Sequence, residues 1–282
     1  MSPTLIALAA LAFGVGADAY PNPKMLVEVE ALGKLDPKTT RVLDARDAKS
    51  YTAGHVPGAV WVDAAAWGKD VGTKDAGWPN RLASVGLAAE TTAVVYATDP
   101  RDAARVWWIL KLAGASDARI LDGGWPAWQA AKGKVETKAN VVTVDPAKLT
   151  ESSGRLATKK DVLSILDDKS AQILDARSDG EFCGDTKSTK RSGHIPGATR
   201  LEWTDLLAPD QKFKSPSELK ALFAEKKIDL DRPSVTYCQS GGRAAVLAFG
   251  LELMGAKSVR NYYKSWSEWG NAEDTPIHVP KK

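Results

Sequence analysis

The stretch Cys238-Gln239-Ser240-Gly241-Gly242-Arg243 brings a thiol, a glycine-bearing loop and an arginine together. It lies between an apolar run that ends at Tyr237 and a run of helical character that begins at Ala244. The N–H groups of such a loop can point at one sulfur atom, and the amino end of a helix adds positive potential, so both favour a thiolate. The pattern predicts Cys238 as a nucleophile. The residues predicted to bind its substrate are Gln239, Ser240, Gly241, Gly242 and Arg243, whose guanidinium can hold an oxyanion.

The spacing of this motif separates two chemistries that use such a loop. A cysteine phosphatase needs the pattern Cys-x5-Arg so that the loop closes around a tetrahedral anion, and here only four residues separate Cys238 from Arg243. A thiolate that attacks the outer sulfur of a donor becomes a persulfide, which inward N–H groups stabilise until an acceptor removes the sulfur. The shorter loop therefore favours sulfur transfer over a phosphatase or an arsenate reductase. An inert cysteine beside a glycine turn remains the alternative.

The elements around the motif predict where the thiol is placed. Short aliphatic runs have the character of strands: 42–44, 93–96, 173–175 and 233–237. Segments of helical period follow them, and capping patterns at Thr158 and Ser215 start two of the helices. Alternation of strands and helices predicts an α/β fold, in which parallel strands are covered by helices on both faces.

An internal repeat divides the chain into two copies of one unit. Residues 94–128 align without a gap on residues 235–269 at a constant offset of 141, with eleven identities. Upstream, 42–46 pairs with 173–177, and 54–59 pairs with 193–198 at an offset eight residues larger. The second copy therefore carries eight additional residues, in the polar run around 184–192. Two copies of one domain account for most of the chain.

The paired motifs resemble the rhodanese family of sulfurtransferases in its tandem two-domain form, over roughly 27–269. The stretch from Tyr51 through His55 to Ala59 is similar to the amino-terminal signature of that family, and the stretch from Tyr262 to Trp269 is similar to its carboxyl-terminal signature. The resemblance implies two tandem rhodanese-like domains, each a parallel sheet flanked by helices. They are a domain without a nucleophile at 20–129, a linker at 130–153 that wraps over the interface, and a catalytic domain at 154–282. Since Ala97 occupies the place of Cys238, one active site is expected.

The chain departs from that family at several positions that bear on the sulfur donor. Tyr263 and Lys264 fill the place of an acidic residue and a glycine, and Glu181 stands where thiosulfate-using relatives can carry a substrate-binding arginine. The loop matches neither the basic loop of those relatives nor the Cys-Gly-Ser/Thr-Gly pattern of mercaptopyruvate enzymes. The resemblance implies transfer of sulfane sulfur from thiosulfate to cyanide or a thiol through a Cys238 persulfide. The alternatives are 3-mercaptopyruvate as donor and a non-catalytic binding module.

Further candidate site residues lie in the carboxyl-terminal signature and in the repeated Asp-x-Arg motif. Lys264 is expected to supply a second cation for the donor, and Trp266 is expected to wall the pocket. Asp175 and Arg177 are candidates for substrate binding, although the same pair in the first copy makes support of the sheet end an alternative. The histidines offer no Cys–His pair and, with two cysteines, no metal set by motif, so neither a metal nor a cofactor is expected. A net charge of +3 over 282 residues argues against nucleic-acid binding. The resemblance implies a small-molecule sulfur donor and a thiophilic acceptor as partners.

The amino end of the chain has the pattern of a signal peptide. An apolar run at 5–15 precedes Ala17-Asp18-Ala19, a small-x-small cleavage pattern before Tyr20, although no lysine or arginine comes before the run. We expect removal of residues 1–19, a periplasmic or secreted protein, and no stable membrane association afterwards. In an exported chain Cys183 could pair with Cys238, and a small loop filler is the alternative role for Cys183.

Overall fold

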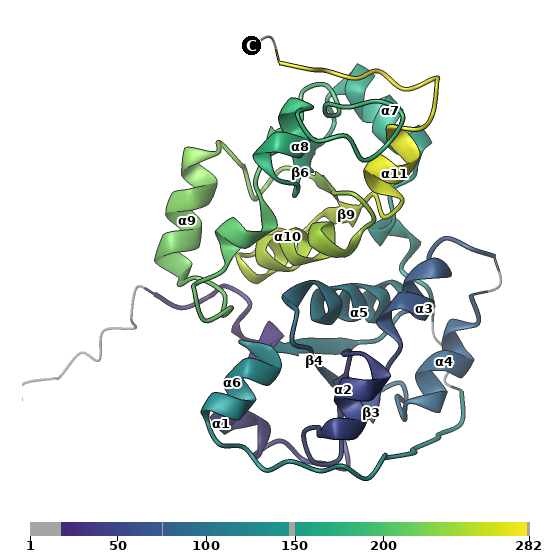
Figure 1. Cartoon of the computed structure of the whole chain (residues 1–282), viewed down its shortest axis with the longest axis vertical. Helices are drawn as coiled ribbons and strands as arrows, with labels where there is room; N and C mark the ends of the chain where they lie inside the picture. The colour runs from purple at the N-terminus through teal and green to yellow at the C-terminus, as the bar shows by residue number, and fades with distance from the viewer. Residues whose placement is uncertain (1–17, 75, 147–149, 281–282) are drawn as a thin grey trace, which may run out of the picture.

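The computed structural model describes residues 18–74, 76–146 and 150–280. It contains two separate parallel sheets, one with strand order β1-β5-β4-β2-β3 and one with order β7-β6-β8-β9. Helices cover these sheets, so the predicted α/β fold of two tandem domains is confirmed (Figure 1). The expected signal segment lies almost entirely outside the described residues.

The first domain holds the five-stranded sheet. Its strands are β1 (Leu26–Val27), β2 (Thr40–Asp44), β3 (Val60–Trp61), β4 (Thr92–Tyr96) and β5 (Asp117–Leu121). Its helices are η1 (Pro23–Met25), α1 (Val29–Leu32), α2 (Ala48–Ala53), α3 (Ala64–Lys69), α4 (Trp78–Ser84), α5 (Pro100–Leu112) and α6 (Gly124–Ala130).

The second domain holds the four-stranded sheet. Its strands are β6 (Gln172–Asp175), β7 (Thr199–Arg200), β8 (Ser234–Tyr237) and β9 (Val259–Asn261). Its helices are η2 (Ser153–Arg155), α7 (Lys159–Asp168), α8 (Asp179–Cys183), η3 (Trp203–Leu206), α9 (Pro216–Glu225), α10 (Gly242–Leu253) and α11 (Ser265–Trp269). The side chains of Thr158 and Ser215 cap α7 and α9 in capping boxes, which confirms both predicted helix starts.

The strand that leads to the thiol is central in its sheet. All four residues of β8 are buried, and β8 pairs with β6 on one side and β9 on the other. A strand buried on both faces holds its ends rigidly, and ligands of open α/β sheets bind at the carboxyl ends of such strands. Cys238 is the first residue after β8, so it lies at that end.

The two domains meet along α5 and α10, which lie side by side at the centre of the molecule (Figure 1). Aromatic rings join them: Trp107 meets Phe249 edge-on with centroids 4.8 Å apart, and Trp108 stacks on Tyr263 at 5.3 Å. Apart from Arg243 and Glu252, helix α10 is apolar, and it is almost wholly buried because its own sheet and α5 both cover it. One continuous apolar core therefore runs through both domains.

Between the end of α6 at Ala130 and the start of η2 at Ser153, the described residues of the linker form no helix or strand. Glu136 pairs through its backbone with His55, the Asn140 N–H donates to the hydroxyl of Tyr51, and the Val144 N–H donates to the carbonyl of Ala83. These contacts fix this part of the linker along the first domain, whereas the sequence suggested a course over the interface. None of the described helices is long and apolar enough to cross a membrane.

Candidate active site

Cys238 lies buried in a turn between β8 and α10, where hydrogen bonds hold both its sulfur and its backbone. Its Sγ accepts a hydrogen bond from the N–H of Gly241 at 3.1 Å, and its own N–H donates to Oγ of Ser265 at 3.1 Å. The N–H of Trp266 donates to the carbonyl of Cys238 at 3.0 Å. The loop thus directs a backbone donor at the sulfur, and α11 fixes the peptide that carries it.

The turn depends on the glycine at position 241. This residue caps α10 with a φ of +87°, in the left-handed region that favours glycine. A Cβ there would also lie 2.5 Å from the ring of Tyr263. The conformation points the Gly241 N–H back at Cys238 and begins α10 immediately afterwards, so the positive end of a twelve-residue helix adjoins the thiol.

Arg243, the arginine of the motif, is already occupied by a carboxylate. Its two terminal nitrogens donate to the two oxygens of Glu181 at 2.6 and 2.8 Å, and both side chains are less than one-fifth exposed. Glu181 also caps α8 by accepting from the N–H and hydroxyl of Ser178. The charge of the Arg243 guanidinium is therefore compensated within the protein. The sequence marked Glu181 as a departure from relatives but did not reveal this pairing.

This ion pair leads to a prediction about acid stability. Burial alone would raise the pKa of the Glu181 carboxyl, but hydrogen bonding and attraction from Arg243 outweigh it and lower that pKa to about 2. Since the folded pKa lies below the ordinary value, this stabilisation is complete above about pH 4.5 and is lost as the pH falls toward 2. Glu181→Gln should lower the free energy of unfolding at pH 7 by about 1–3 kcal/mol and flatten its decline below pH 4.5.

Urea unfolding at pH 7, 4.5 and 3 measures this dependence. Glu225→Gln, which alters an exposed carboxylate at the end of α9, is the matched control. It should change neither the free energy of unfolding at pH 7 nor the decline of that free energy below pH 4.5. An equally steep decline in Glu181→Gln and in the unmodified chain would show that the pair does not stabilise the fold.

Asp175 and Arg177 form a buried ion pair beneath the loop. The guanidinium of Arg177 donates to both carboxylate oxygens of Asp175, with the shortest bond 2.6 Å long, and to the carbonyl of Gly193 at 2.8 Å. It also lies 4.4 Å from the ring centroid of Trp266, which is itself 1% exposed. Asp175, Arg177 and Trp266 therefore form one enclosed cluster that ties β6 to α11.

The first domain repeats this cluster without a nucleophile. Arg46 donates to Asp44 and to the carbonyl of Gly54, and lies 4.0 Å from the ring centroid of Trp125. Since Ala97 occupies the place of the cysteine in that domain, the cluster also forms where the nucleophile is missing. This geometry favours support of the sheet end for Asp175 and Arg177, while substrate binding by them stays a prediction.

The remaining predicted site residues are more open. The side chain of Gln239 accepts from Ser188 at 2.9 Å, so the insertion of the second copy lies against the catalytic loop. Ser240 is exposed. The side chain of Lys264 is 66% exposed and its Nζ lies 3.7 Å from Glu268, so the lysine points along α11.

The two cysteines are both free in this structure. Cys183 is only partly buried, and its Sγ lies 3.9 Å from a carboxylate oxygen of Asp179. Burial together with the charges of Asp179 and Asp185 raises the pKa of the Cys183 thiol above its ordinary value, which disfavours a reactive thiolate.

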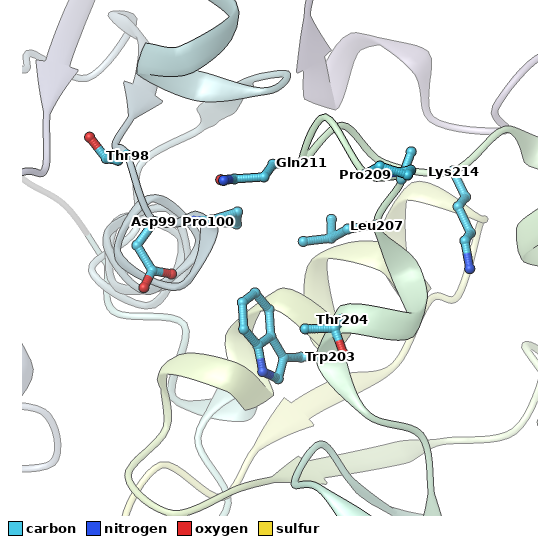
Figure 2. Close-up of a pocket in the computed structure, with 10 residues that line it drawn as sticks. Thr98, Asp99, Pro100, Trp203, Thr204, Leu207, Pro209, Gln211 and Lys214 are labelled. Carbon is cyan, nitrogen blue, oxygen red and sulfur yellow. The ribbon is translucent and has the colours of Figure 1, made fainter.

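A cavity of about 740 Å³ lies between the domains, away from the thiol. The start of α5 forms one side with Asp99 and Pro100, and the segment from Trp203 to Lys214 forms the other (Figure 2). Cys238 does not line this cavity, so the geometry around the thiol defines the candidate active site.

Comparison with known proteins agrees with this geometry. The family model described as "Rhodanese-like domain" matches residues 28–131 and 158–272. The chain belongs to the rhodanese family. Thiosulfate sulfurtransferase of Corynebacterium glutamicum is 33% identical over 287 residues, covering 93% of each chain. Bovine thiosulfate sulfurtransferase is 32% identical and covers 89% of this chain and 91% of its own. The 3-mercaptopyruvate sulfurtransferase of mouse is 32% identical, covering 79% and 80%.

Solved structures show the same architecture. YnjE superposes with a TM-score of 0.83 at 25% identity, over 93% of this chain and 70% of its own. A persulfide form of EanB with ergothioneine superposes with a TM-score of 0.83 at 23% identity, which compares the fold alone. The predicted rhodanese family, tandem arrangement and sulfurtransferase class are thus confirmed, and the donor is a separate question.

Proposed function

We propose that this rhodanese-family sulfurtransferase uses thiosulfate as its donor and forms a persulfide on Cys238. The thiolate attacks the outer sulfur of thiosulfate, the sulfur–sulfur bond of the donor breaks, and sulfite leaves with the electron pair. Cyanide or a thiolate then takes the outer sulfur and the Cys238 thiolate is regenerated. The observation that carries the proposal is the buried Sγ that faces the Gly241 N–H at the start of α10, because such donors stabilise an anionic persulfide.

Uptake of sulfur by the intact protein tests this proposal. After incubation with thiosulfate and removal of the excess, the protein mass should rise by one sulfur atom, and addition of cyanide should return it to the starting value. A non-catalytic binding module would keep its mass unchanged. A phosphatase or arsenate reductase would likewise take up no sulfur.

The donor preference is a prediction of its own. We expect a higher kcat/KM with thiosulfate than with 3-mercaptopyruvate, because thiosulfate carries two negative charges into a loop that a helix end makes positive. Relatives with either name match the chain at the same overall identity of 32%, so that identity favours neither donor. Steady-state kinetics with both donors decides, and faster turnover with 3-mercaptopyruvate would reverse the assignment.

The same kinetics tests Lys264 as a donor-binding residue. Its exposed position beside Glu268 argues for a small effect, so Lys264→Gly should change the thiosulfate KM by less than about twofold. A clear rise in that KM would return the lysine to the site.

We further propose that the protein is exported and that its mature form begins at Tyr20. In the folded chain Tyr20 is already anchored, since its hydroxyl donates to the carbonyl of Lys214 at 2.7 Å. Asn22 next to it donates to the carbonyls of Leu253 and Glu252. Amino-terminal sequencing of the protein from its native source should therefore start at Tyr20 in a periplasmic or secreted fraction. Recovery of residues 1–19 on a cytosolic protein would contradict the proposal.

A further inference from the structure

Arg105 belongs to α5 of the domain without a nucleophile, yet its guanidinium reaches the catalytic loop of the other domain. Its Nη1 donates to the hydroxyl of Tyr263 at 3.1 Å, and its Cζ lies 5.9 Å from the centroid of that ring. A Cβ on Gly242 would lie 2.6 Å from Nη2 and 3.2 Å from Cζ of Arg105. Only a glycine at 242 therefore allows the guanidinium to approach the first turn of α10 this closely. That turn begins four positions after Cys238.

The positive charge of Arg105 has no carboxylate partner at close range, whereas the charges of the neighbouring arginines do. The neighbouring arginines have carboxylate partners: Arg243 with Glu181, Arg177 with Asp175, and Arg101 with Asp99. In the part of the chain that the structure describes, no carboxylate oxygen lies within 4.0 Å of the Arg105 nitrogens, and its buried Nε has no hydrogen-bond partner. Asp102, one turn earlier on α5, acts on it only at longer range. Asp99 likewise acts on it only at longer range. Among the arginines described around the catalytic loop, Arg105 is therefore the one without a carboxylate oxygen within 4.0 Å.

The internal repeat explains why the carboxylate is missing. Position 263 of the second copy corresponds to Asp122 of the first, at the constant offset of 141. Asp122 is buried and accepts from the N–H of Phe213 across the interface, at 3.0 Å. In the second copy Tyr263 faces the opposite domain instead and meets Arg105. A phenol orients the guanidinium but leaves its charge in place, and that charge acts strongly where water is largely excluded.

We propose that Arg105 is a donor-binding residue of the Cys238 site and takes the oxyanion group of an anionic sulfur donor, of the thiosulfate or thiosulfonate class. This inference rests on the proposed sulfurtransferase function for the identity of the donor. It makes the domain without a nucleophile a contributor to specificity. Arg243, the arginine of the motif, is held by Glu181 and is left to fix the loop.

Alkylation of Cys238 tests the cation without any sulfur chemistry. In a Cys183→Ser background Cys238 is the only thiol, and iodoacetate and iodoacetamide alkylate it by the same reaction while differing in charge. The rate constant for iodoacetate divided by that for iodoacetamide reports how strongly the surroundings of the thiolate attract an anion. Arg105→Gln should lower this ratio about tenfold, because a charged hydrogen-bond donor is lost. Arg105→Lys should keep it within about threefold of the starting value.

Two further variants separate charge from structure. Arg155→Gln removes another arginine of the interface, which pairs with Glu252 and lies over Trp107, and should leave the ratio unchanged. Tyr263→Asp restores the carboxylate of the first copy and should lower the ratio while Arg105 is present. If Arg105→Gln slows both reagents equally, or alters neither, Arg105 is not an anion-binding residue and the inference is overturned.

Thiosulfate kinetics completes the test. Arg105→Gln should raise the thiosulfate KM about tenfold and change kcat by less than about threefold, as expected for loss of binding that is equal in the ground and transition states. An unchanged KM would overturn donor binding by Arg105. If the alkylation ratio falls in Arg105→Gln but no variant takes up sulfur from thiosulfate, the anion site stands and the proposed function fails.

Discussion

Replacement of Cys238 by serine should abolish sulfur transfer while leaving the fold intact. A hydroxyl is a far weaker nucleophile than a thiolate, and loss of a covalent nucleophile lowers turnover by roughly 10⁴-fold or more. The Gly241 N–H and the Ser265 hydroxyl remain in place around the new side chain. The free energy of unfolding should therefore change by no more than about 1 kcal/mol. Turnover of thiosulfate and cyanide, with mass measurement after thiosulfate alone, checks both parts.

The vestigial site of the first domain supplies the matched control. Ala97 lies at the end of β4 and its carbonyl accepts from the N–H of Trp125, as that of Cys238 does from Trp266. Pro100 and Arg101 replace the two glycines of the catalytic loop, and a proline supplies no N–H. Ala97→Cys in the Cys238→Ser background should thus remain free of persulfide. Residual transfer by Cys238→Ser alone would remove Cys238 from the reaction.

Breaking the buried ion pair of either domain should be among the most destabilising single changes in the chain. Arg177→Met leaves the carboxylate of Asp175 buried without its partner and frees the carbonyl of Gly193, which costs about 3–5 kcal/mol. Arg46→Met does the same to Asp44 and Gly54 in the first domain, and a similar loss is expected there. Equilibrium unfolding of the two variants measures these costs.

The comparison also decides the role of Arg177 in catalysis. If it supports the sheet end, the folded fraction of Arg177→Met should show a thiosulfate KM within about threefold of that of Arg46→Met. A KM higher by tenfold or more in Arg177→Met alone would show that this arginine binds the donor. A small loss of stability in both variants would contradict the structural role of the pair.

Much of the fold could be predicted from the sequence because its signals are local or duplicated. The short aliphatic runs became central strands β2, β4, β6 and β8. The capping residues Thr158 and Ser215 start helices because their partners lie three residues away. The duplication of the Asp-x-Arg motif also suggested a supporting role beside the predicted role in substrate binding, since one copy has no nucleophile.

The parts that the sequence did not reveal depend on contacts between distant segments. Glu181 and Arg243 lie 62 residues apart, and no spacing rule predicts their pairing. Arg105 and Tyr263 lie 158 residues apart in different domains, and they meet only because α5 packs on α10. Charge compensation at the site was therefore invisible in the motif, where Arg243 seemed the free cation.

The burial of α10 between its own sheet and α5 has a consequence for any shortened form of this chain. A fragment containing only 154–282 would expose to water the face of α10 that α5 now covers, including Phe249, and would be prone to aggregate. The first copy holds no cysteine, yet its deletion would remove one side of the shared core. The first domain therefore keeps the second soluble, whatever it contributes to turnover.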